Sequence, residues 1–146
     1  MSSVDSLGPR VVVDECVWEL AAKSNFKAQA LLALLFTDKA KLVIDEGCEY
    51  YRRLLKKLNS IRHSCAGAIA HLLNIIFRSR DLLDYKEPVD VEDAPKEDRL
   101  IAGLAVMADA LITEDEELKE WFKHERLRTK VLKIDEALSI LRGKSQ

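Results

Sequence analysis

The chain has 146 residues, of which 48% are hydrophobic, and its formal net charge at pH 7 is -2. This length is typical of one compact domain, and the charge argues against a constitutively basic nucleic-acid binder. The longest apolar stretch, residues 100–108, is too short to cross a membrane. Three cysteines without a CxxC pair argue against a disulfide framework or a structural zinc site. We expect one cytoplasmic domain over residues 1–146, with flexible tails at 1–9 and 142–146.

Short apolar runs alternate with helical patterns along the chain. The β-branched run at residues 11–13 predicts a buried strand over residues 10–14. Further strands are expected at residues 41–44, 89–91, 111–113 and 130–134. The spacing of apolar residues predicts helices over residues 17–21, 26–36, 46–58, 61–83, 96–108, 116–124 and 135–141. This alternation predicts an α/β fold, a three-layer α/β/α sandwich with a mainly parallel central sheet of four to five strands.

Acidic residues lie where these strands are expected to end. Asp14 follows the first strand directly, and Asp115 lies two residues beyond the strand at 111–113. Asp98 opens the apolar helix that leads into that strand. Because ligands of an open parallel sheet bind outside the carboxyl ends of its strands, we expect these side chains to meet there.

Each of these acids also has an ordinary structural alternative. Asp14 could cap the helix that follows it, and Asp98 could be a favourable charge in the first turn of its helix. Thr113 and Glu116 fit a capping box, with Asp115 between them. A functional role is therefore expected from the acids as a group and not from any one of them.

A fourth acid is expected after the second strand, and its position is the least defined. Glu49 lies in the first turns of the helix that follows this strand. Asp45 and Glu46 lie within one turn of it and are alternatives for the same role. A surface ion pair between Glu49 and Arg52 or Arg53 is the structural alternative.

A cluster of such acids favours a cation. Two carboxylates about 4 Å apart repel by roughly 4 kcal/mol at an effective dielectric constant near 20. Carboxylate oxygens without Cys or His partners suit Mg²⁺ or Mn²⁺. Such ions activate water for attack on phosphodiesters and stabilise the leaving oxygen. The chain has no GxxxxGK[ST] or GxGxxG motif and no Ser-His-Asp or Cys-His pattern that would indicate another chemistry.

Several segments resemble the PIN domain family. Residues 11–14 are similar to the family's opening strand and first acid, and residues 96–102 to its third acidic motif. Residues 108–115 are similar to its most recognisable segment, in which Thr113 and Asp115 match a Thr/Ser-x-Asp pattern. Residues 49–50 resemble the second motif.

The resemblance implies a metal-dependent ribonuclease, often the toxin of a toxin–antitoxin pair, or an RNA-processing factor. It implies that Asp14, Glu49, Asp98 and Asp115 bind Mg²⁺ or Mn²⁺ and that Thr113 supports the site by hydrogen bonding. It also implies RNA as the substrate, an antitoxin-like protein partner and a homodimer.

Glu15 and Cys16 depart from the family, which has Thr or Ser and then a small polar residue after the first acid. This departure keeps a second hypothesis open, a catalytically silent PIN-like module that binds RNA or a protein partner. A third is a phospho-receiver domain, because Asp14 and Glu15 loosely fit its acidic pair.

Two basic stretches could neutralise RNA phosphates, although an ordinary solvated helix face is the alternative for each. The first contains Arg52, Arg53, Lys56, Lys57 and Arg62, and the second contains Lys119, Lys123, Arg126, Arg128 and Lys130.

Overall fold

The computed structural model describes residues 7–38 and 40–144. Its strands are β1 (Arg10–Val13), β2 (Lys41–Asp45), β3 (Leu83–Lys86), β4 (Ala110–Ile112) and β5 (Lys130–Leu132). They form one sheet in the order β3-β2-β1-β4-β5, and every neighbouring pair is parallel. The helices are α1 (Glu15–Ala22), α2 (Phe26–Thr37), α3 (Glu49–Ser60), α4 (Ala66–Arg78), α5 (Arg99–Ala105), α6 (Glu116–Glu125) and α7 (Ile134–Lys144). The predicted α/β class and parallel sheet are confirmed.

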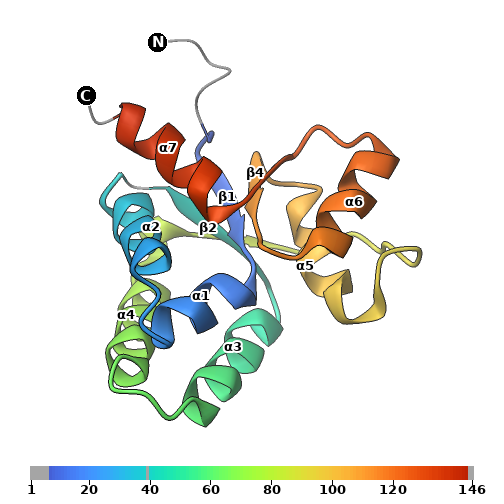
Figure 1. The fold of residues 1–146 in the computed structure, drawn as a ribbon. Helices are drawn as coiled ribbons and strands as arrows, with labels where there is room; N and C mark the ends of the chain where they lie inside the picture. Colours follow the sequence, from blue (N-terminus) through green and yellow to red (C-terminus); the bar gives the residue numbers. More distant parts are fainter. Residues whose placement is uncertain (1–6, 39, 145–146) are drawn as a thin grey trace.

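The helices form two layers around the sheet. The chain runs from β1 through β2 to β3 in one direction and then crosses back to β4 and β5. Because parallel crossovers are right-handed, a change of direction places the later helices on the opposite face. Figure 1 shows α1 to α4 on one side and α5 and α6 on the other, while α7 returns to pack on α2. The arrangement is the predicted three-layer sandwich.

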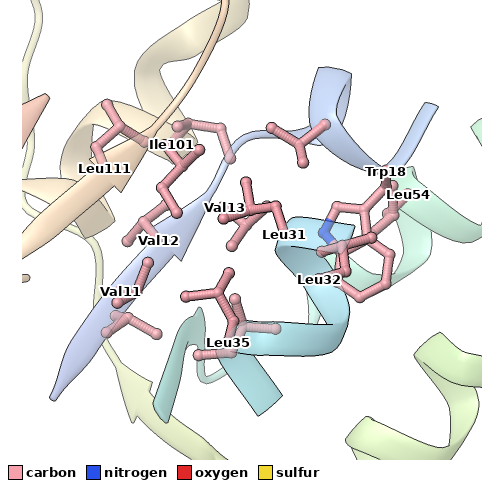
Figure 2. Packing of buried hydrophobic residues seen from close by; sticks show 14 of the residues in the cluster. Val11, Val12, Val13, Trp18, Leu31, Leu32, Leu35, Leu54, Ile101 and Leu111 are labelled. Carbon is pink, nitrogen blue, oxygen red and sulfur yellow. The ribbon is translucent and has the colours of Figure 1, made fainter. Parts of the chain in front are cut away.

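The central strand β1 is buried on both faces, as its unbroken apolar run predicts. Val11, Val12 and Val13 are at most 1% exposed. Figure 2 shows these side chains between Leu31 and Leu35 of α2 on one side and the side chains of α5 and β4 on the other. The packing fixes the position of the residue that follows β1.

The predicted helix over residues 61–83 is wrong at both ends. Helix α4 covers only Ala66–Arg78, and a 3-10 turn at Arg80–Leu82 leads into strand β3. Leu83 is the one fully buried residue of this edge strand, so β3 lacks the apolar run that marks a central strand. No strand forms at residues 89–91, where the Val89 amide instead donates to the Gly103 carbonyl of α5. A Cβ at Gly103 would overlap the Val89 carbonyl, which explains the glycine.

The two predicted tails are partly ordered. Leu7 is buried, and the Lys41 amide donates to the Pro9 carbonyl over 2.8 Å. Helix α7 continues to Lys144, beyond the predicted start of the C-terminal tail. Residues 1–6 and 145–146 lie outside the described residues. In the described ranges, no helix combines the length and the apolar character needed to cross a membrane.

Candidate functional site

A cavity of about 300 Å³ opens at the carboxyl ends of β1 and β4. The crossovers that leave these neighbouring strands lead to opposite edges of the sheet, which makes this the switch point at which ligands bind in open α/β folds. The cavity is lined by Asp14, Glu15, Cys16, Glu19, Arg53, Lys57, Glu97, Asp98, Glu114 and Asp115. The structure thus brings together three of the four predicted acids, from separate parts of the chain.

Asp14 is fixed by a hydrogen-bond chain across the two strands. Its carboxylate accepts the Thr113 hydroxyl at 2.6 Å and the Glu15 amide at 2.7 Å. The Asp115 amide donates in turn to the Thr113 hydroxyl at 3.0 Å. Burial raises the pKa of Asp14, the hydrogen bonds from Thr113 and Glu15 oppose this shift, and the charge of Asp115 adds to it. Asp14 also precedes α1 as its cap, so its structural and candidate functional roles coexist.

Asp115 belongs both to the cavity and to the start of α6. Its carboxylate accepts the amides of Glu117 at 3.0 Å and Leu118 at 3.3 Å. Asp115 is therefore the cap itself, whereas the predicted capping box assigned that position to Thr113. The cap orients the Asp115 carboxylate at the cavity wall.

Asp98 ends a 3-10 turn over Lys96–Asp98 and precedes α5. The pKa of Asp98 is raised to about 7, first by partial burial, then by the charge of Asp115 and a side-chain hydrogen bond with it. The charges of Asp14 and Glu117 raise the pKa further. A proton on Asp98 relieves the repulsion that the sequence predicts for this cluster.

This proton makes the stability of the metal-free protein depend on pH. The pKa of Asp98 rises on folding from an ordinary value of 3.8 to about 7, so its contribution to stability is present below pH 3.8 and is lost as the pH rises to about 7. With chelator present near pH 8, Asp98→Asn is expected to raise the free energy of unfolding by ~1 kcal/mol after allowance for solvent screening. This corresponds to a rise in melting temperature of about 2–4 °C. Near pH 5 the melting temperatures of Asp98→Asn and the parent protein should differ less. An equal rise in melting temperature at both pH values would contradict the raised pKa of Asp98.

The structure does not bring Glu49 to the cavity. Glu49 is exposed as the first residue of α3, and its neighbour Tyr50 faces the core. Asp45 is buried, and its carboxylate accepts the amides of Glu49 at 2.7 Å and Tyr50 at 2.9 Å. These hydrogen bonds satisfy the first amides of α3, which begins at Glu49 after Cys48 and not at Glu46 as predicted. Neither alternative, Asp45 or Glu46, is among the residues that line the cavity.

Glu15 is one of four lining acids outside the predicted set, the others being Glu19, Glu97 and Glu114. The Glu15 side chain is buried, and its carboxylate lies 3.1 Å from Arg53 Nη2 and 3.6 Å from Lys57 Nζ. Burial raises the pKa of Glu15, and the charges of Arg53 and Lys57 oppose the shift. Arg53 also donates to the Glu97 carbonyl at 3.1 Å. Arg53 and Lys57 are one helical turn apart, so the sequence indicates that they share one face of their helix. Their pairing with Glu15 depends on how α1 and α3 pack, which the sequence does not indicate.

The donor set fits a hard cation, although the cation site is not preformed. Within residues 7–38 and 40–144, no group of three His, Cys, Asp or Glu side chains is arranged to hold a metal ion. Burial raises the pKa of the Cys16 thiol to about 12, so carboxylates are the anionic donors of the cavity. Oxygen donors of this kind suit Mg²⁺ or Mn²⁺ and not Zn²⁺. The proton on Asp98 occupies the electrostatic role that a cation would take.

No family model, curated protein or solved structure matches this chain. The likeness to the PIN family therefore depends on the segments around Asp14, Asp98 and Asp115. The geometry of the cavity is the remaining basis for assigning a function.

Proposed function

We propose that the protein is a PIN-type ribonuclease that uses Mg²⁺ or Mn²⁺ to hydrolyse phosphodiesters of single-stranded or structured RNA. The supporting observation is that Asp14, Asp98 and Asp115 line one cavity at the switch point of a parallel sheet. Carboxylates gathered in this way are unfavourable without a proton or a cation. A divalent ion meets that need and also supplies the chemistry of phosphodiester hydrolysis.

In this proposal each side chain has a defined task. Asp14, Asp98 and Asp115 hold the ion, which when bound lowers the pKa of its water and stabilises the leaving oxygen. Thr113 keeps the Asp14 carboxylate in place through its 2.6 Å hydrogen bond. Arg53 and Lys57, the two basic side chains among the lining acids, attract the phosphodiester to the cavity. Glu49 is not assigned a task, because its exposed side chain does not line the cavity.

The PIN resemblance extends the proposal to partners. We propose that the protein acts in the cytoplasm as a homodimer, either as a toxin held by an antitoxin-like protein or as an RNA-processing factor. The basis is the likeness of the motifs at residues 11–14, 96–102 and 108–115 alone.

Metal binding is the direct test. A ligand that binds only the folded state at about 100 times its dissociation constant adds ~2.7 kcal/mol of stability. For a chain of this size, saturating Mn²⁺ is therefore expected to raise the melting temperature by about 5–10 °C. Asp98→Asn should reduce this shift, whereas Asp81→Asn, at an exposed position outside the cavity, should keep it. Melting that Mn²⁺ leaves unchanged in the parent protein, together with no heat of binding, would exclude the metal site.

The silent-module hypothesis has an observation in its favour. Both Asp14 oxygens already accept protein donors, Glu15 and Cys16 included. A silent module would show neither the melting shift nor the heat of Mn²⁺ binding, so the same measurements distinguish the two hypotheses. The receiver hypothesis requires an Asp at the end of the third strand, and β3 ends at Lys86, which is followed by Glu87.

A further inference from the structure

A second cavity, of about 480 Å³, adjoins the acidic one. It is lined by Glu19, Lys23, Lys57, Ser60, Ile61, Arg62 and His63. Glu19 and Lys57 line both cavities, so the two lie side by side along α1 and α3. The first cavity is rich in carboxylates, whereas the second is rich in basic side chains.

The basic side chains of the second cavity differ in how they are engaged. Lys57 lies 3.6 Å from a carboxylate oxygen of Glu15 and also 3.6 Å from one of Glu19. Lys23 and Arg62 are exposed, and neither side chain has an ion-pair partner among the residues that the structure describes. These two cations are therefore available to an anion from outside.

An RNA substrate needs such cations beside the acids. A cavity dominated by carboxylates repels a polyanion, so the affinity for RNA must come from basic groups nearby. Lys57 stands at the junction, where a phosphate could pass from one cavity to the other. A flexible single strand can place neighbouring phosphates in both cavities at once. A small free anion can occupy only one of them, so it would not bind more tightly because the cavities are adjacent.

We propose that the cavity formed by Lys23, Lys57, Arg62 and His63 binds backbone phosphates of a single RNA strand next to the phosphodiester that is cut. This inference rests on the proposed ribonuclease function and adds the path of the substrate. Lys23 and Arg62 supply the free charges, and Lys57 connects the path to the acidic cavity. The second basic stretch, of which Lys119 and Lys123 lie on α6, lines neither of these two cavities.

The test measures binding without cleavage. In an Asp14→Asn background with chelator, the double variant Lys23→Ala, Arg62→Ala is expected to bind a labelled single-stranded oligouridylate ~10-fold more weakly by fluorescence anisotropy. Loss of two phosphate contacts should also reduce the slope of log affinity against log salt by about 1.4. The matched control is Lys41→Ala, Arg80→Ala, which removes the same charge at the amino end of the sheet and should bind like its parent.

The outcomes separate this inference from the proposed function. Equal losses in the double variant and its control would reduce the effect to net charge and overturn the inference. An unchanged affinity in the double variant would overturn it even if the parent protein cleaves RNA. Competition by oligoglutamate as strong as by oligouridylate would indicate an acidic protein partner and also overturn it. A specific loss of binding supports the phosphate path even if no cleavage is found, in which case the ribonuclease proposal fails alone.

Discussion

Asp14→Asn is expected to reduce Mn²⁺-dependent RNA cleavage by about 100-fold or more, because it removes a charge from the proposed ion site. The substitution keeps an oxygen that can accept the Thr113 hydroxyl, now at 2.6 Å, so the fold should persist. Asp14 is also a buried carboxylate whose pKa burial raises, so a neutral amide does not leave an uncompensated charge. The measurement is the initial rate of cleavage of a labelled RNA at saturating Mn²⁺.

The matched control is Asp81→Asn. Asp81 is an exposed acid in the 3-10 turn at Arg80–Leu82 and lies outside the cavity. The Asp81→Asn variant should cleave RNA at the parent rate. The slower cleavage by Asp14→Asn could then not be explained by the loss of any one carboxylate. Cleavage by Asp14→Asn at the parent rate, with a normal melting temperature, would show that the observed nuclease activity does not use this cavity.

The sequence predicts the centre of the fold and of the site for one physical reason. A strand covered by helices on both faces must be apolar throughout, so its end is visible as the first charged residue. That rule identifies β1 and Asp14, and also β4 with Thr113 and Asp115 beyond it. Because ligands of an open parallel sheet bind at the carboxyl ends of its strands, the sequence predicts that these side chains gather at one edge. The structure adds that β1 and β4 are neighbours, which brings the side chains into contact.

The parts that the sequence does not predict depend on weaker or longer-range signals. Strand β3 lies at the sheet edge with Leu83 as its one buried residue, and Leu82 and Leu83 continue the helical spacing of α4. Asp45 is a plausible helix cap from the sequence, but the helix begins at Glu49, whose exposed side chain lies outside the cavity, and no apolar pattern shows that orientation. Glu15 enters the site because α3 presents Arg53 to it, a contact 38 residues apart in the chain.

A single buried hydroxyl joins α3 and α1 to the end of β1, directly beside Asp14. The Tyr50 hydroxyl donates to the Val13 carbonyl at 2.5 Å and accepts the Trp18 indole N–H at 2.9 Å. All three residues are at most 1% exposed. Figure 2 shows Trp18 of α1 beside Leu54 of α3, at one side of the core that also contains Val13. Water cannot replace the hydroxyl at so buried a position without a space opening for it.

Tyr50→Phe is therefore expected to lower the free energy of unfolding by about 3 kcal/mol, because it leaves a buried carbonyl and a buried indole N–H without partners at about 1–3 kcal/mol each. The melting temperature should fall by roughly 10 °C, measured by thermal or urea unfolding. Tyr85→Phe removes the same hydroxyl from an edge strand where the side chain is 44% exposed, and it should change stability by less than about 0.5 kcal/mol. Equal stabilities of the two variants would mean that the end of β1, and with it Asp14, is held by apolar packing and not by the Tyr50 hydrogen bonds.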